Sequence, residues 1–286
     1  MNRIPDLLLC VGAQKSGTTW LYNRMAEHED TRTSLFKEMH YFTTVHNRNL
    51  QGPALKAEAM RQMIEKEPRR VAEYFRALAT GETPENDEHR LFRPMNDEWY
   101  VGMFRGNGRY TLDFTPAYAK LGDEAHAHIQ RISERQKVIF VMREPLDRAL
   151  SAVRYLFKGR GQNIATATEA EIMDVARNPQ IVKLSNYKKT IDTLERNYAA
   201  ENLRFLFYET MMNEKARTLD AICDWLEISR LSLPSEKLEA RDNSTAAADI
   251  PAAVVDYLAE ATTPFRASVE ARLPEAREAW AKFASA

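Results

Sequence analysis

A glycine-bearing turn between an apolar run and a helix-like segment constrains the fold of this chain most. Residues 7–11 are continuously apolar, which is typical of a strand buried on both faces of a sheet. The turn at residues 12–19 follows directly, and we expect a helix from about Thr18 to Glu27. A strand, a tight turn and a helix in this order predict one unit of a parallel α/β sheet.

The same arrangement recurs along the chain. Apolar residues 138–142 precede Pro145 and a helical pattern that ends at about Lys158. A third run at 203–208 precedes a helical pattern to about Leu226, and a weaker strand at 110–114 precedes one at roughly 123–135. This alternation predicts an α/β fold of three layers, with a central parallel sheet and helices on both faces.

Two polar regions, at about 47–105 and 159–185, interrupt the alternation. We expect them to be insertions, the second being a loop with one short helix. The C-terminal part is predicted to be helical, with interruptions at Pro264 and Pro274. Because no segment has the composition of a linker, we predict a single domain over residues 1–286.

Composition excludes several classes of protein. Lys and Arg number 40 and Asp and Glu 41, a net charge of −1 that disfavours a nucleic-acid partner. No apolar run approaches the roughly 18 residues of a membrane span, and no cleavage region of a signal peptide follows residues 7–13. The two cysteines, Cys10 and Cys223, are too few for a disulfide framework. We therefore expect a cytoplasmic protein without a membrane span.

The turn at residues 12–19 carries groups that bind an anion. Gly12 and Gly17 let the backbone curl, so that successive N–H groups can point at one anion. The N-terminus of the following helix adds partial positive charge. Thr18 and Thr19 add hydroxyl donors, and Lys15 adds a full charge. These groups predict a phosphate-binding loop, and a tight turn without a ligand is the alternative.

The loop departs from the nucleotide-triphosphate pattern G-x-x-x-x-G-K-[ST]. Thr18 stands where that pattern has its lysine, and Lys15 lies inside the loop. Arg143 follows the strand at 138–142, where a kinase commonly has an acidic residue for Mg²⁺. A cation there repels Mg²⁺ and attracts another anion, so we expect an anionic nucleotide that is handled without a metal. Two different functions stay open: a small-molecule kinase that uses ATP, and a nucleotide-binding module without catalysis.

One family matches this loop. The 5′-phosphosulfate loop of the sulfotransferases that use 3′-phosphoadenosine 5′-phosphosulfate (PAPS) resembles the run Gln14, Lys15, Ser16, Gly17, Thr18, Thr19 and Trp20. The family also has an arginine after a strand and a serine eight residues later, which Arg143 and Ser151 match. The resemblance implies a P-loop-like fold, with PAPS as co-substrate that leaves as 3′,5′-adenosine bisphosphate (PAP) and no required metal.

The resemblance also implies roles for these residues. Ser16 to Thr19 would cradle the 5′-phosphate, and Lys15 would stabilise the leaving phosphate. Arg143 and Ser151 would hold the 3′-phosphate, for which a forked guanidinium is well suited. The alternative for Arg143 is an ion pair with a nearby acid such as Asp147. Arg148, further along, is expected on a salt-bridged helix face.

Several more residues are implied by less specific motifs. Trp20 would stack on adenine, or else is a core residue of the first helix. Tyr208 lies at the family's strand-to-helix corner and is expected to contact the nucleotide. Glu209, next to it, either starts and caps a helix or touches nucleotide. Arg241 and Asn243 lie in the late loop, where relatives close over the 3′-phosphate.

A third element supplies a candidate base. Residues 37–42, Lys-Glu-Met-His-Tyr-Phe, resemble the Lys-Glu-x-His-(Tyr/Phe)-Phe element of heparan-sulfate-type and bacterial carbohydrate sulfotransferases. The resemblance implies that Glu38 is the general base and that Lys37 steadies the transferring group. His40 is the rival base, because a histidine serves in the aryl and steroid branch. Without a catalytic role, His40 would pack beside its aromatic neighbours and Glu38 would be exposed or held in a salt bridge.

Together these motifs predict a sulfotransferase of the EC 2.8.2 type. It would move a sulfuryl group from PAPS to an acceptor hydroxyl of a carbohydrate, glycolipid or small molecule, with an acceptor nitrogen as the alternative. No activated nucleophile is evident, which favours direct in-line transfer. The lack of an anchor suggests a bacterial-type soluble enzyme. The sequence specifies neither the acceptor nor the oligomeric state.

Overall fold

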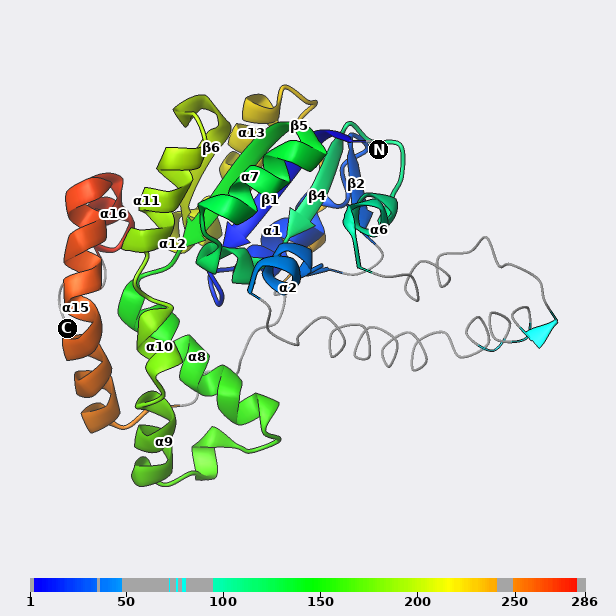
Figure 1. Cartoon of the computed structure of the whole chain (residues 1–286). Coiled ribbons are helices and arrows are strands. Elements are labelled where there is room, and N and C mark those ends of the chain that lie inside the picture. The colour runs from blue at the N-terminus through cyan, green and yellow to red at the C-terminus, as the bar shows by residue number, and fades with distance from the viewer. Residues whose placement is uncertain are drawn as a thin grey trace. The chain divides into compact units, whose positions relative to one another are not determined.

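A mostly parallel sheet organises the computed structural model, which describes residues 3–34, 37–47, 95–240 and 249–281 and positions 72, 76, 79 and 80. The strands are β1 (Ile4–Gly12), β2 (Thr31–Ser34), β3 (Phe104–Arg105), β4 (Tyr110–Phe114), β5 (Ser133–Met142) and β6 (Leu203–Phe207). They form one sheet in the order β3-β2-β4-β1-β5-β6 (Figure 1). β1 and β2 each pair in parallel with β4, β5 pairs in parallel with β6, and only β2 and β3 are antiparallel among these pairs. The predicted α/β fold is confirmed.

Helices fill most of the connections between strands. Those described are α1 (Thr18–Met25), α2 (Tyr41–Asn47), α6 (Asp97–Gly102), α7 (Asp123–Ile132), α8 (Pro145–Gly159), α9 (Glu169–Ala176), α10 (Pro179–Lys183), α11 (Lys188–Asn197), α12 (Tyr208–Asn213), α13 (Lys215–Leu226), α14 (Ser235–Glu239), α15 (Ala252–Arg272) and α16 (Glu275–Ala279). Short 3₁₀ turns lie at Pro116–Lys120, Ile164–Thr166 and Ala200–Asn202. Pro145 is in the first turn of α8, where the Glu144 side chain accepts the Asp147 N–H at 2.7 Å.

The four strands that apolar runs predict are all present, as β1, β4, β5 and β6. The sequence did not predict β2 and β3, because β2 reads Thr-Arg-Thr-Ser and β3 has two residues. The helical stretch expected to Leu226 is two helices, α12 and α13. Residues 159–185 hold both α9 and α10 rather than one short helix. Most of the expected insertion at 47–105 lies outside the described residues.

Pro264 does not interrupt the C-terminal helices as predicted. α15 continues through it, from Ala252 to Arg272. An internal proline removes one helical hydrogen bond and crowds the preceding turn. Packing on both sides offsets that cost, because Leu258 before the proline and Val269 after it are both buried. Pro274 does separate α15 from α16.

By its internal contacts the chain forms two compact units. The first unit comprises residues 1–10 and 26–137, and the second comprises residues 11–25 and 138–286. In the first unit, aromatic rings pack together, with Tyr41 stacked on Tyr100 at 4.9 Å between ring centroids. The single-domain organisation stays a prediction.

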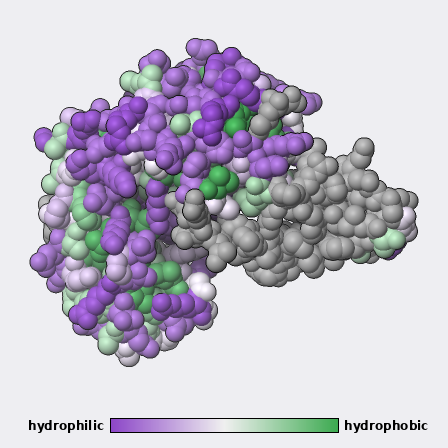
Figure 2. All heavy atoms as spheres, in the orientation of Figure 1, coloured by the Kyte–Doolittle hydropathy of each residue, from purple (hydrophilic) through white to green (hydrophobic). Residues whose placement is uncertain are grey.

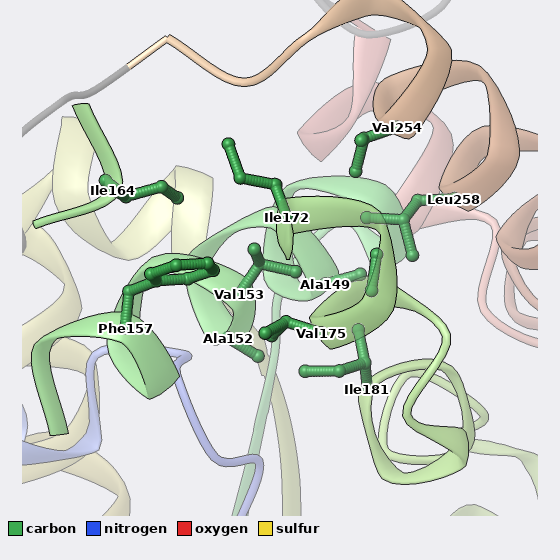
Figure 3. Close-up of a cluster of buried hydrophobic side chains, with 11 residues drawn as sticks. Ala149, Ala152, Val153, Phe157, Ile164, Ile172, Val175, Ile181, Val254 and Leu258 are labelled. Carbon is green, nitrogen blue, oxygen red and sulfur yellow. The ribbon is translucent and has the colours of Figure 1, made fainter. Parts of the chain in front are cut away.

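The second unit has an aliphatic core around α8. Ala149, Val153 and Phe157 recur every four residues on α8 and therefore share one face. This face packs against residues of α9, α10 and α15, among them Ile172, Ile181 and Leu258 (Figure 3). α15 runs beside α8 (Figure 1). The packing fixes α8, the helix that carries Ser151.

The surface matches the high charge content of the chain. Hydrophilic residues predominate on the face that Figure 2 shows, and hydrophobic residues occupy smaller areas of it. Among the helices in the described part of the chain, none is both long and apolar enough to cross a bilayer.

Candidate nucleotide-binding site and candidate base

The loop between β1 and α1 has the backbone geometry of an anion-binding turn. Lys15 and Gly17 both have positive φ angles, of 69° and 76°, so the chain alternates in handedness there. A side chain at Gly17 would place its Cβ 2.8 Å from Tyr208 Cδ2 and 2.8 Å from Met211 Cε. Only glycine allows α12 to pack this closely against the turn.

Arg143 lies directly after β5 and reaches this loop. Its Nη1 donates to the carbonyl oxygen of Lys15 at 3.1 Å. Its Nε donates to Asp147 Oδ2 at 2.7 Å, so the ion pair expected as the alternative to phosphate binding is present. The guanidinium also lies 4.5 Å from the ring centroid of Tyr208. With 16% of its side chain exposed, Arg143 is held on three sides by its own unit.

Lys15 has an aromatic neighbour that sequence reasoning missed. Its Nζ lies 4.1 Å from the ring centroid of Tyr155, a cation–π contact. Tyr155 is one helical turn beyond Ser151 on α8 and is 53% exposed, whereas Ser151 is buried. An aromatic residue one turn after the predicted serine was the signal that could have identified it.

The remaining residues predicted in the loop differ in exposure. Ser16 and Thr18 are buried, and Gln14 and Thr19 are half-buried. Trp20 is 3% exposed and donates its indole N–H to the Leu238 carbonyl at 3.2 Å. It therefore packs as a core residue, and its stacking on adenine stays a prediction.

Three further residues were predicted near the nucleotide, and the structure describes one of them, Glu209. Arg241 and Asn243 fall outside the described residues. Glu209 is in the first turn of α12, where its carboxylate accepts N–H groups from Glu144 and Trp280, at 2.9 Å each. It joins three segments of the second unit.

Arg148 is not on a salt-bridged surface. Its side chain is fully buried, with Nε donating to Ser185 Oγ at 2.6 Å and Nη2 to the Ile181 carbonyl. The reason is that Arg148 adjoins the buried face of α8, where it meets the end of α10. Arg148 is a structural residue of the second unit.

The predicted donor groups fit a nucleotide with two anionic ends. Loop N–H groups, Lys15 and Arg143 come together in one unit, and all of them donate or carry positive charge. Within the described residues, no three side chains of His, Cys, Asp or Glu are grouped to hold a metal ion.

The candidate base lies in the first unit, at a strained stretch of backbone. Glu38 and His40 have φ angles of 63° and 50°, which are uncommon for residues with side chains. Lys37 Nζ lies 2.9 Å from Glu38 Oε1, and His40 Nε2 lies 3.5 Å from Glu38 Oε2. Glu38 is therefore in a salt bridge, and its side chain is 39% exposed.

These neighbours control the charge of Glu38. Burial alone would raise the pKa of its carboxyl group. The hydrogen bond from His40 and the charge and hydrogen bond of Lys37 outweigh burial and lower the pKa to about 2. Glu38 is therefore an anion at neutral pH, as a proton acceptor must be.

A buried carboxylate next to this cluster was not predicted. Asp113, the fourth residue of β4, is 1% exposed and accepts hydrogen bonds from Tyr100 OH at 2.8 Å and Thr115 Oγ1 at 2.7 Å. Burial raises the pKa of Asp113 above its usual value, although hydrogen bonds from Thr115 and Tyr100 oppose the shift. The sequence signal was one charged residue within a strand whose other residues are uncharged.

Comparison with known proteins identifies the family. The profile described as "Sulfotransferase family" matches residues 6–232. The chain belongs to the sulfotransferase family. No curated protein matches it.

Solved structures of sulfotransferases share its fold. One is a sulfotransferase from Alicyclobacillus acidocaldarius, with 16% identity and a TM-score of 0.60 over 94% of this chain and 95% of that one. Another is the sulfotransferase domain of the curacin biosynthetic pathway, with 17% identity and a TM-score of 0.50 over 94% and 99%. Mouse sulfotransferase SULT7A1, solved in complex with PAP, has 15% identity and a TM-score of 0.49 over 97% and 88%.

Proposed function

We propose that this sulfotransferase moves a sulfuryl group from PAPS to an acceptor hydroxyl. The observation that carries the proposal is the hydrogen bond from Arg143 to the carbonyl of Lys15. It brings a forked cation within reach of a loop with N–H groups and a second cation. A nucleotide that is phosphorylated at both its 5′ and 3′ positions needs two such groups close together.

The loop residues of the second unit bind the phosphosulfate end of the donor in this proposal. Ser16, Gly17, Thr18 and Thr19 bind the 5′-phosphate, with Gln14 at the start of the loop. Lys15 neutralises the phosphate oxygen that leaves as its bond to sulfur breaks.

The remaining donor contacts hold the adenosine part of the nucleotide. Arg143 and Ser151 bind the 3′-phosphate, while Asp147 keeps the guanidinium plane oriented. Tyr208 contacts the nucleoside, whereas Trp20 is buried with its indole N–H on the Leu238 carbonyl. Arg241 and Asn243, which lie outside the described residues, stay predicted contacts of the 3′-phosphate. These contacts bind and orient the donor and take no part in proton transfer.

The candidate base removes a proton from the acceptor. As the acceptor oxygen bonds to sulfur, its proton goes to the Glu38 carboxylate. His40 and Lys37 lower the pKa of the Glu38 carboxyl group, so the carboxylate becomes a stronger base when part of this pairing is lost during transfer. Lys37 breaks its ion pair with Glu38 and moves to the transferring sulfuryl group, where its positive charge stabilises negative charge. His40 then keeps Glu38 in place.

Two observations favour this proposal over an ATP-dependent kinase. Thr18 occupies the lysine position of the triphosphate loop, and Arg143 follows β5 where an acidic residue would hold Mg²⁺. A nucleotide-binding module without catalysis would explain the loop but not the Lys37–Glu38–His40 cluster with its strained backbone.

Calorimetry tests the donor directly. We expect PAP to bind without a divalent metal and to bind more tightly than ATP, because only PAP carries the 3′-phosphate that Arg143 meets. Titrations would use PAP, ATP and ATP with Mg²⁺. Tight binding of ATP that needs Mg²⁺, with no binding of PAP, would overturn the proposal.

The acceptor is assigned only by class. The resemblance of residues 37–42 favours a carbohydrate or glycolipid, with a small molecule as the second candidate. We also infer a cytoplasmic enzyme, since the buried thiols of Cys10 and Cys223 suit a reducing compartment. A bacterial-type enzyme is favoured by the resemblance of residues 37–42 to bacterial relatives. A screen of acceptors with a sulfur-35-labelled donor identifies the class by which compound becomes labelled.

A further inference from the structure

The C-terminal helices contact the same corner of the second unit that carries Arg143 and Tyr208. Trp280, just after α16, is fully buried and donates its indole N–H to Glu209 Oε2 at 2.9 Å. The second oxygen of Glu209 accepts the backbone N–H of Glu144 at 2.9 Å. One carboxylate thus links α16 to the backbone beside Arg143.

A second contact reinforces the first. Arg266 of α15 donates from Nη2 to the Trp280 carbonyl at 3.0 Å, and its Nη1 lies 3.8 Å from Glu144 Oε1. Its Nε is paired with Glu270 at 2.7 Å. The Trp280 ring meets Phe207, the last residue of β6, edge to face at 5.5 Å. The C-terminal helices are therefore joined to the segments that follow both β5 and β6.

Those two segments carry the groups that stack on each other. Arg143 precedes Glu144, Tyr208 precedes Glu209, and the Arg143 guanidinium lies over the Tyr208 ring. Any shift of Glu144 or Glu209 therefore changes the spacing of this stacked pair. The helices that hold them, at 252–279, lie beyond the residues that the family profile matches, 6–232.

We propose that Trp280 and Arg266 form a C-terminal clamp that sets the position of Arg143 and Tyr208 for the donor nucleotide. Both are positioning residues, since they act through Glu209 and Glu144. The proposal rests on the proposed donor site at Arg143. It assigns a function in donor binding to helices outside the family-matched region.

The clamp depends on the charge of Glu209. Burial raises the pKa of this carboxyl group, whereas the N–H of Glu144, the charge of Arg143 and the indole of Trp280 favour its anion. Burial also raises the pKa of Glu144. Asp147, Tyr187 and Arg266 also face this corner. Loss of the Trp280 N–H raises the pKa of Glu209 further, so the anion disappears at a higher pH.

A pair of matched variants tests the clamp. Trp280→Phe keeps a buried ring and removes only the N–H that Glu209 accepts. Trp225→Phe is the control, because its indole N–H donates in the same unit to the Glu201 carbonyl, at 2.8 Å, and not to Glu209 or Glu144. For wild type and both variants, the Kd of PAP is measured by calorimetry over a series of pH values from acidic to neutral, because burial raises the pKa of Glu209 above its usual value.

We expect Trp280→Phe to weaken PAP binding about tenfold at neutral pH, the scale of a lost hydrogen bond to a charged group. Its loss of affinity with acid should also begin at a higher pH than in wild type, while Trp225→Phe follows wild type. The shift in pH is the readout that a merely structural role would not produce. Thermal unfolding monitors whether each variant is folded.

The outcomes separate the two proposals. A wild-type protein that does not bind PAP contradicts the proposed function. A wild type that binds PAP, with Trp280→Phe and Trp225→Phe alike in Kd and pH dependence, overturns the clamp. Should Trp280→Phe not fold, Glu209→Gln is titrated in the same way. The clamp predicts that Glu209→Gln binds PAP more weakly and that its affinity no longer falls as Glu209 would be protonated. Unchanged PAP binding in Glu209→Gln overturns the clamp.

Discussion

The donor loop and the candidate base differ in how their charge is arranged. Around the loop, the charged side chains of Lys15 and Arg143 are permanent cations at neutral pH, and the loop backbone supplies the remaining positive potential. At the base, Glu38 is held by Lys37 and His40, so three titratable groups partly neutralise one another. The first arrangement can bind an anion at rest, whereas the second must change its pairing before it can take a proton.

The largest effect is expected at the donor loop. Lys15→Met removes the cation that we propose neutralises the leaving oxygen, so kcat should fall by on the order of 10²- to 10³-fold. The rate is measured with the sulfur-35-labelled donor and an acceptor found by screening. Lys158→Met, at the exposed end of α8, is the control and should keep the wild-type rate. A kcat near that of wild type in Lys15→Met would show that another group stabilises the leaving oxygen.

At the base, Glu38→Gln should lower kcat by on the order of 10²-fold. The amide keeps the size of the side chain but cannot accept the acceptor proton. The Kd of PAP should stay unchanged, which separates the two regions. Glu98→Gln, on the exposed side of α6, is the matched control. Full activity in Glu38→Gln would move the role of base to His40.

A smaller effect is expected from Arg143→Ala. PAP binding should weaken by about 1.5–3 kcal/mol, the range for a hydrogen bond to a charged group. Asp147 is then left without its partner, and its negative charge repels the nucleotide phosphates and adds to the loss. Calorimetry measures the change. Unchanged affinity would mean that the 3′-phosphate lies elsewhere.

Lys37→Met tests how strongly Lys37 controls the titration of the Glu38 carboxyl group. In wild type the Glu38 pKa is lowered to about 2, so its anion persists from neutral pH until the pH falls to about 2. Removing the Lys37 charge raises that pKa, so the anion should be lost at a higher pH. A carbon-13 NMR titration of the Glu38 carboxyl group follows this directly. An unchanged titration would show that His40 alone controls Glu38.

The loop, Arg143 and Ser151 could be singled out from the sequence because they lie in short, contiguous motifs next to regular strands, and their roles in donor binding stay predictions. The partners of these residues could not be singled out. Tyr155 reaches Lys15 through the geometry of α8, and Trp280 reaches Glu209 from 71 residues away. The burial of Arg148 likewise depends on α10, which packs from another part of the chain. Local motifs identify the groups, but long-range packing determines their partners and their charge.

The resting contacts of the two donor cations have a consequence for affinity. Arg143 already has Asp147, and Lys15 already has the ring of Tyr155. A nucleotide that binds to Arg143 and Lys15 therefore competes with Asp147 and Tyr155 for these two cations. Added salt competes with both the old and the new pairing, so the binding of the donor should respond to ionic strength less steeply than its number of phosphate charges suggests.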